Sequence, residues 1–227
     1  MTGRPVMAGT PKPPAKPKFS AGGLRALTAE ALENESVYRG RVLEGSALAD
    51  SVLAGSVLES VSFESCVFRD LNLNGTQWSR VRLADVRFER CTFDGASWSE
   101  ASLERAEVQD CRFLGLQAPG VRMRDVRLTR VQAPLSLWFR ADTRKLWCED
   151  CDLTEAVFQE AQLPGAVFRA CRLAKTDFSG AGLSGADLRA SPLTGTRIGL
   201  RELAGVTVET VQLMDLAHLL GVTVADL

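Results

Sequence analysis

The chain of 227 residues carries 27 basic and 28 acidic residues, a formal net charge of −1, and 45% of its residues are hydrophobic. This balance gives no long-range attraction toward nucleic acid or anionic membranes. No apolar run approaches the roughly 18 residues of a membrane span. The N-terminus lacks the apolar stretch of a signal peptide, so we expect a cytoplasmic location and no membrane contact. A single histidine, His218, limits the acid–base and metal chemistry available.

The segment 1–40 differs in composition from the rest of the chain. Residues 1–20 are rich in proline, lysine and small residues, a composition that buries too little apolar surface to offset its ordering entropy. We predict a disordered tail over 1–20, with lysines that are either solvated or in contact with a polyanion. Residues 24–33 have the apolar spacing of a short amphipathic helix. We therefore expect residues 21–40 to form an N-terminal cap.

A five-residue repeat occupies residues 41–206. The third place of each block is large and apolar, and the first place is small, from about Leu43 to Leu203 without insertion or deletion. A period of five is neither the 3.6 of a helix nor the 2 of a strand. The in–out–in–out–out pattern predicts short β segments separated by corners, and short repeats stacked in this way form a solenoid.

The rarer residue types add a second, longer period. Tryptophan, cysteine and glycine each recur at every fourth block or its multiples, and Ala118 lies between two tryptophans as if a small residue made room for large ones. Three residue types with one period predict four blocks per coil, a four-sided prism. The residues of these columns are Trp78, Trp98 and Trp138; Cys91, Cys111, Cys151 and Cys171; and Gly55, Gly75, Gly95 and Gly115.

These blocks resemble the A(D/N)LXX consensus of pentapeptide-repeat proteins, as in ADLRA at 186–190 and CDLTE at 151–155. The resemblance covers the whole repeat region, 41–206, and implies a right-handed quadrilateral β-helix, an all-β solenoid. It also implies a role in binding, since quinolone-resistance members interact with the type II topoisomerases DNA gyrase or topoisomerase IV.

Residues 207–227 depart from the five-residue pattern. The segment 207–220 has an apolar helix face, with Thr207 or Thr210 as N-cap and Gly221 as C-cap, and a short strand VTV follows. Such an element either caps the open edge of the last coil or also forms a homodimer, as in several family members. The candidate dimerisation residues are Val211, Met214, Leu216, Ala217, Leu219, Leu220 and Val222.

The sequence contains no motif that is typical of a catalytic or cofactor-binding site. Cys148 and Cys151 form a lone CxxC, but both fall at inward places of the repeat, and no second pair or nearby histidine completes a zinc site. The cysteine column is interpreted as a buried lining of free thiols. We expect no enzyme activity, no cofactor and no metal.

The charged residues alternate in sign at every fourth block. An arginine-rich stretch at 122–145 resembles a nucleic-acid patch when read along the chain. Read down the columns, each basic residue lies one coil from an acid, which predicts ion-pair ladders and no direct nucleic-acid binding. The same pairing leaves no strongly acidic face to imitate DNA. The ladders are Asp70, Arg90, Asp110, Arg130 and Asp150; Asp85, Arg105, Asp125 and Lys145; and Arg87, Glu107 and Arg127.

One stretch near residues 133–147 places aromatic residues at outward positions. They form either an exposed anchor for a partner or a local distortion that buries them. With nearby acids they are the candidate partner-binding residues: Leu137, Phe139, Trp147, Glu149, Asp150, Asp152 and Glu155. The functional hypothesis is a non-catalytic protein that binds a type II topoisomerase and modulates its inhibition. The alternative is a structural or adaptor scaffold for an unrelated protein.

Overall fold

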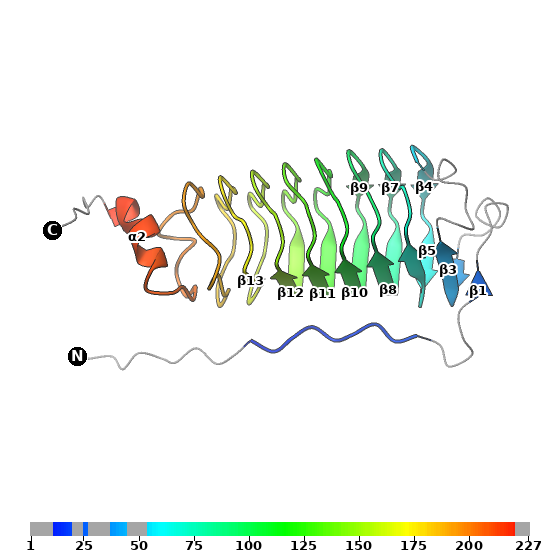
Figure 1. Cartoon of the computed structure of the whole chain (residues 1–227), viewed down its shortest axis with the longest axis horizontal. Helices are drawn as coiled ribbons and strands as arrows, with labels where there is room; N and C mark the ends of the chain where they lie inside the picture. The colour runs from blue at the N-terminus through cyan, green and yellow to red at the C-terminus, as the bar shows by residue number, and fades with distance from the viewer. Residues whose placement is uncertain (1–10, 20–24, 27–36, 45–53, 221–227) are drawn as a thin grey trace.

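The computed structural model describes residues 11–19, 25–26, 37–44 and 54–220. These residues form one parallel β-solenoid whose coils stack along a straight axis, with a short helix at the C-terminal end (Figure 1). Every strand pair is parallel, and from β4 onward paired residues lie four blocks apart in the sequence, as in Trp78↔Trp98. The prediction of a solenoid with four five-residue blocks per coil is confirmed.

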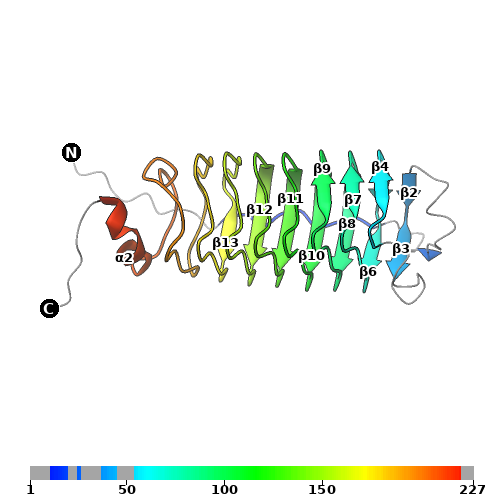
Figure 2. The same ribbon diagram turned by 90° about the horizontal axis from the view of Figure 1, so that it is seen from above.

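The strands follow the inward and outward places of the repeat. Their bounds are β1 (Arg25–Ala26), β2 (Val37–Arg39), β3 (Arg41–Glu44), β4 (Val57–Glu59), β5 (Ser62–Glu64), β6 (Val67–Arg69), β7 (Gln77–Ser79), β8 (Arg82–Glu89), β9 (Ser97–Ser99), β10 (Ser102–Gln109), β11 (Arg122–Thr129), β12 (Asp142–Glu149) and β13 (Val167–Arg169). One sheet runs β1-β3-β6-β8-β10-β11-β12-β13, and β4-β7-β9 lie on a second face (Figure 2). Beyond β13, isolated bridges keep the same register.

The corner of each block is a residue with positive φ. The fifth place takes φ values near +55°, as at Asp70, Asp85 and Arg90. Side chains other than glycine rarely adopt this conformation. It is held here by hydrogen bonds between coils, such as the Asp70 N–H donating to the Glu89 carbonyl at 2.9 Å. The glycine column at Gly55 and Gly75 occupies the same place in the block without the Cβ penalty.

The core is a set of vertical side-chain stacks inside the prism. Trp78 and Trp98 stack at 5.4 Å between ring centroids with an interplanar angle of 6°. Ala118 is fully buried in the same column, and above it Trp138 stacks on Phe158 at 6.1 Å. The expected alternation of large and small residues in this column is therefore observed. Such stacked aromatic contacts add to the hydrophobic burial of the rings.

The N-terminal end differs from the prediction in two respects. The expected helix over 24–33 is wrong at Arg25–Ala26, which form β1 and pair with β3; residues 27–36 lie outside the described part. The repeat also begins before residue 41, because Tyr38 is buried and stacks on Phe63 at 5.0 Å.

The first coil is longer than the others. β2 pairs with β5 and β3 with β6 at an offset of five blocks instead of four, as in Val37↔Ser62 and Val42↔Val67. This coil therefore contains one extra block, and the connection passes through residues 45–53, outside the described ranges. An added block of five residues leaves the phase of the repeat intact, as predicted. The prediction of four blocks per coil is wrong for this coil, which has five.

Candidate protein-binding surfaces

Ion-pair ladders run along the solenoid, at its corners and, for Arg87 and Glu107, on the strands β8 and β10. Their acidic and basic members come from the same place in successive coils and are brought together by stacking. The predicted pairs are observed: Arg90–Asp70 at 2.6 Å, Arg130–Asp110 at 2.6 Å, Arg105–Asp85 at 2.7 Å, Lys145–Asp125 at 3.2 Å and Arg87–Glu107 at 2.9 Å. In the arginine-rich stretch at 122–145, Arg130, Arg140 and Lys145 pair with acids of neighbouring coils. Arg144 instead lies beside Arg124 in the register of β11 and β12, so the prediction of an acid one coil from each basic residue is wrong at that position.

The pairing changes the proton affinity of the acids. The hydrogen bond from Arg105 holds the pKa of the Asp85 carboxyl below its usual value, and Arg90 does the same for Asp70. A hydrogen bond from Arg130 likewise lowers the pKa of Asp110. These carboxylates are therefore ionised at neutral pH and already bound to a cation. A partner that sought free negative charge on these ladders would have to displace an arginine.

The Trp147 side chain is buried rather than exposed. Its ring lies between the guanidinium groups of Arg127 and Arg169, at 5.1 and 5.3 Å from the ring, and only 7% of the residue is accessible. Its indole N–H donates to Glu149 at 3.3 Å, and Glu149 also contacts Arg127 at 3.6 Å. Cation–π contact on both faces stabilises this arrangement. Of the two alternatives for Trp147, the structure has the buried one.

Leu137 and Phe139 are half-buried. The Arg140 guanidinium lies over the Phe139 ring at 4.8 Å and Arg140 also pairs with Glu160 at 2.7 Å. Phe139 is thus covered by an arginine, as Trp147 is. The neighbouring Leu135, 54% exposed, is the large apolar side chain that this coil presents most openly.

The predicted acidic residues do not form one free acidic spot. Asp152 contacts Arg172 at 3.7 Å and accepts from the Thr154 hydroxyl at 2.6 Å. Glu155 pairs with Lys175 at 3.1 Å. Asp150 is an exposed corner residue with φ of +55°. Together with the Glu149 contacts above, these pairs distribute the charge over several coils.

The proline-rich segment 11–19 lies along the solenoid (Figures 1 and 2). The Ala15 N–H donates to Asp125 and the Lys18 N–H to Asp85, both at 2.9 Å. The Ser65 hydroxyl donates to the Lys18 carbonyl at 3.0 Å. The prediction of a disordered tail over 1–20 therefore does not describe residues 11–19, and no sequence pattern indicates which face they contact.

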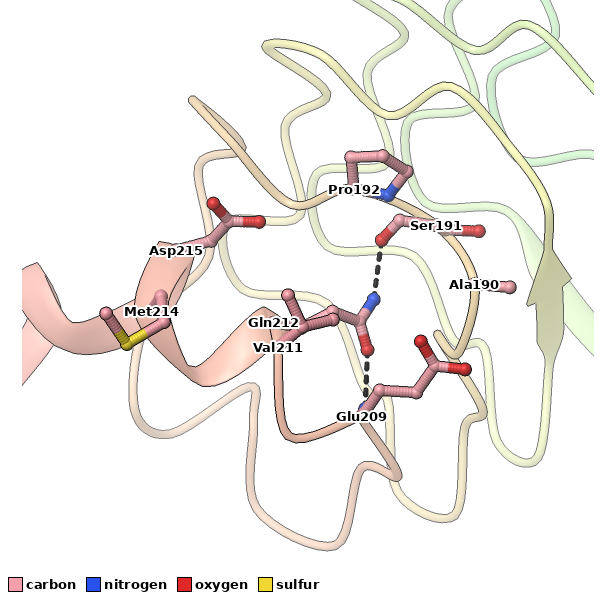
Figure 3. A pocket seen from close by; sticks show the side chains of 8 residues that line it. All are labelled: Ala190, Ser191, Pro192, Glu209, Val211, Gln212, Met214 and Asp215. Atoms are coloured by element: carbon pink, nitrogen blue, oxygen red, sulfur yellow. Dashed lines mark hydrogen bonds between the residues drawn. The ribbon is translucent and has the colours of Figure 1, made fainter.

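The C-terminal cap consists of α2 (Gln212–Leu216) and the 3₁₀ helix η1 (Ala217–Leu220). Its N-cap is Val211, with no side-chain cap, so the expected caps Thr207 and Thr210 are wrong. The buried Gln212 side chain anchors the helix instead. Its amide donates to the Leu188 carbonyl at 2.7 Å. The amide also donates to the Ser191 carbonyl at 2.5 Å, and its oxygen accepts from the Glu209 N–H at 2.6 Å (Figure 3).

Asp215 provides a second anchor on the same helix. Its carboxylate accepts from the Leu193 N–H at 3.1 Å and from the Thr194 hydroxyl at 2.9 Å. Backbone groups in the last coil have no further coil with which to form hydrogen bonds. Gln212 and Asp215 form hydrogen bonds with some of these groups instead. Neither residue was predicted from the sequence; the available signal was two polar residues three apart, hence on one helix face, within an apolar segment.

The candidate dimerisation residues divide into two groups. Leu216 is buried in the core and Leu219 packs against it, so both serve the cap. Val211 and Met214 are 70% and 58% exposed, and Leu213, which was not predicted, is 54% exposed. Ala217 is intermediate. The side chain of Leu220, and the whole of Val222 with the expected VTV strand, lie outside the described part.

A shallow pocket of about 350 Å³ adjoins the exposed residues of the cap (Figure 3). Val211 and Met214 line it from the helix side, and Pro192 and Ala190 line it from the last coil. Glu209 and Asp215 add carboxylates at its edge. This mixture of apolar wall and acidic rim suits a protein surface more than a phosphate or nucleic-acid ligand.

The cysteines lie inside the solenoid. All six thiols are free and buried, and burial raises the pKa of Cys148 well above its usual value. Among the residues that the structure describes, no group of three His, Cys, Asp or Glu side chains could hold a metal ion. Nor does any helix within those ranges have the length and apolarity needed to cross a membrane.

The fold and its surfaces define a class of protein: a β-solenoid of five-residue repeats with charge-paired corners and a helical C-terminal cap. The sequence model of the family described as Pentapeptide repeats matches residues 82–115 and 151–189, in 8 copies. The repeats of these two stretches are pentapeptide repeats of that family.

Solved structures similar to the chain include other pentapeptide-repeat proteins. HetL, involved in heterocyst differentiation regulation in the cyanobacterium Nostoc sp. strain PCC 7120, is 18% identical over 74% of this chain and 81% of its own, with a TM-score of 0.44. Full-length QnrB1, a plasmid-mediated fluoroquinolone resistance protein, is 20% identical over 88% and 100%, with a TM-score of 0.38. A search of the curated proteins finds no significant match. At these identities and TM-scores, the likenesses carry no argument about a partner.

Proposed function

We propose that the protein is a non-catalytic binding protein whose solenoid and cap form docking surfaces for other protein chains. The observation that carries this proposal is the exposed apolar surface on the cap. Val211, Leu213 and Met214 are each more than half exposed, while most charges on the solenoid corners are paired with each other. Exposed apolar groups beside a polar rim are typical of protein interfaces.

We further propose that the cap mediates a homodimer. Leu216 and Gln212 already anchor the helix on its inner side, so the outward residues are not needed for capping. In a two-fold dimer the same patch meets itself, which an apolar helix surface satisfies without charge repulsion. The alternative, a cap alone, leaves Val211, Leu213 and Met214 in water.

Sedimentation velocity tests the dimer. We expect the full-length protein to sediment as a dimer and the Leu213→Glu/Met214→Glu variant as a monomer, because carboxylates would be buried against each other in the interface. Leu114→Glu is the matched control: Leu114 is an exposed leucine on the side of the solenoid, and its substitution should leave the dimer intact. A wild-type monomer, or a double variant that still dimerises, contradicts this role of the cap.

As the partner we propose a type II topoisomerase, DNA gyrase or topoisomerase IV, which the protein protects from inhibitors in the cytoplasm. The support is the match of the repeats to the pentapeptide-repeat family, whose quinolone-resistance members interact with these enzymes. The paired acids of the ladders do not favour imitation of duplex DNA, so contact would depend on shape and on local groups. The second candidate, a scaffold for an unrelated protein, shares the same docking surfaces.

A supercoiling assay separates the two candidates. Purified gyrase is assayed with and without a fluoroquinolone, across a titration of the full-length protein. The topoisomerase proposal predicts recovery of supercoiling in the presence of drug, or a change in supercoiling without it. No change in either condition, together with no co-sedimentation with gyrase, would leave the scaffold function as the better account.

A further inference from the structure

The segment 11–19 has a three-residue period in its contacts with the solenoid. Pro11, Pro14 and Pro17 are half-buried, whereas Lys12, Pro13, Ala15, Lys16 and Lys18 are exposed. The two N–H groups that donate to the solenoid, on Ala15 and Lys18, are also three residues apart. A three-residue period with regularly spaced prolines is typical of polyproline II, which has three residues per turn.

The acceptors on the solenoid have a matching spacing. Asp85 and Asp125 occupy the same corner two coils apart, with Arg105 and Lys145 at that corner in the alternate coils. Two coils correspond to about 9.6 Å at the spacing of adjacent strands. One turn of polyproline II rises about 9.3 Å. Because the charge sign alternates along the ladder, a carboxylate lies at every second coil. This spacing matches the length of one turn of a polyproline II chain, so each turn can meet one carboxylate.

Side-chain contacts on either side fix the position of the segment. The Arg87 guanidinium lies 5.2 Å from the centre of the Phe19 ring. Lys16 lines a hollow with Glu89 and Glu107 from β8 and β10. The segment thus presents prolines and a phenylalanine to the surface, and Lys16 lies in a hollow where Glu89 and Glu107 alternate with Arg87 and Arg127. The segment is therefore held by backbone hydrogen bonds, by proline packing and by the Arg87–Phe19 contact, in addition to any attraction between opposite charges.

We propose that the face formed by the Asp85–Asp125 corner and the adjoining β8, β10 and β11 residues is a binding site for a polyproline II peptide of Pro-x-x triplets. Residues 11–19 are its intramolecular ligand. The site reads two features: N–H groups three residues apart, which meet alternate-coil aspartates, and prolines at the preceding positions, which pack on the solenoid. A lysine-bearing proline-rich peptide with this spacing is the ligand class that the site accepts when the chain's own segment leaves it.

Trypsin gives a direct readout in the full-length protein. Arg4, Lys12 and Lys16 each precede proline, which blocks cleavage, so Lys18–Phe19 is the one susceptible bond in residues 1–19. When opening and closing are fast, cleavage tracks the population of the open form. We expect slow release of the 1–18 peptide from the wild-type protein, measured by mass spectrometry, relative to cleavage of a synthetic peptide of residues 11–23.

Ala15→Pro tests the hydrogen bond without touching the solenoid. Proline keeps the polyproline II conformation and removes the donor to Asp125. Because a hydrogen bond to a charged group is lost, cleavage at Lys18–Phe19 should accelerate roughly tenfold or more. Pro13→Ala, at an exposed position outside the period, is the matched control and should leave the rate near that of wild type.

Asp125→Ala tests the acceptor. It should accelerate cleavage as much as Ala15→Pro, and the two together should add little, because both remove the same bond. Asp110→Ala breaks a similar ion pair on another ladder and is the control on the solenoid side. Wild-type cleavage as fast as that of the free peptide, or no acceleration in both Ala15→Pro and Asp125→Ala, would overturn the proposal.

Binding in trans tests the ligand class. A fluorescent peptide of residues 11–19 is titrated into the full-length Ala15→Pro protein and followed by anisotropy. We expect saturable binding that Asp85→Ala abolishes and that a peptide with one extra proline after Lys16 does not show, since its donors are four residues apart. No binding of the 11–19 peptide, or equal binding of both peptides, contradicts recognition of the three-residue period.

Discussion

Replacement of Gln212 by alanine tests how the cap protects the end of the solenoid. The substitution removes two donors, to the Leu188 and Ser191 carbonyls, and one acceptor, for the Glu209 N–H. Gln212 is only 4% exposed, so the bonds are shielded from water. At about 1 kcal/mol net for each bond, the loss is about 3 kcal/mol, reduced to about 2 kcal/mol where water enters the adjoining pocket.

The loss should be local, because each coil of a solenoid contacts mainly its neighbours. Native-state hydrogen exchange is the appropriate assay. Protection of the Leu188 and Thr207 amides, which bond between the last coils, should fall about 30- to 160-fold, the equivalent of about 2–3 kcal/mol. Amides of β11 should keep their protection. Gln117→Ala, which removes a single exposed bond to Gly115 at 3.0 Å, is the control.

A uniform decrease in protection across all coils would refute the local role of Gln212. Unchanged protection of Leu188 and Thr207 would refute its role as an anchor.

Three further predictions concern the core and the ladders. Trp98→Ala should lower the free energy of unfolding by about 3–5 kcal/mol, because it leaves a cavity in the tryptophan stack. Ala118→Leu should lower it by about 1–3 kcal/mol, because the larger side chain overpacks the same column. Urea denaturation measures both changes, and losses below about 1 kcal/mol would contradict the packing described. The buried thiols, with the raised pKa of Cys148, should resist an aromatic disulfide reagent in the native protein and react after denaturation; rapid native labelling would contradict their burial. The pKa of Asp85 in the folded protein lies below its unfolded value of about 3.9. Its contribution to stability is therefore present above that pH and is lost as the pH falls through the folded pKa. An acid titration followed by circular dichroism should show a smaller loss of stability with falling pH in Arg105→Gln than in wild type, and identical profiles would refute the linkage.

The inward side chains and the coil length could be predicted from the sequence because stacking repeats one environment once in every coil. Any residue type suited to that environment then recurs at that interval, as with Trp78 and Trp98. Most of the ion-pair ladders could be predicted for the same reason, because residues four blocks apart lie beside each other in adjacent coils. The burial of Trp147 could not be predicted in this way, because it depends on Arg127 one coil away and on Arg169, which is outside its column.

Other features were not accessible to a periodicity argument. The extra block in the first coil preserves the five-residue phase and changes only the pairing offset between β2 and β5. The place of the tail on the solenoid depends on the distance between coils, which relates Asp85 to Asp125 although they are far apart in the sequence. The N-terminal helix was predicted from apolar spacing, whereas Arg25–Ala26 instead find a parallel partner in β3.

We propose that this solenoid works by binding another protein, with a type II topoisomerase as the partner. Sedimentation velocity of the full-length protein mixed with purified DNA gyrase tests that claim most directly, with Leu114→Glu and Leu213→Glu/Met214→Glu run in parallel. We expect a shared, faster-sedimenting boundary for wild type and Leu114→Glu, and a weaker one for Leu213→Glu/Met214→Glu. Separate boundaries for the two proteins at every concentration would contradict it.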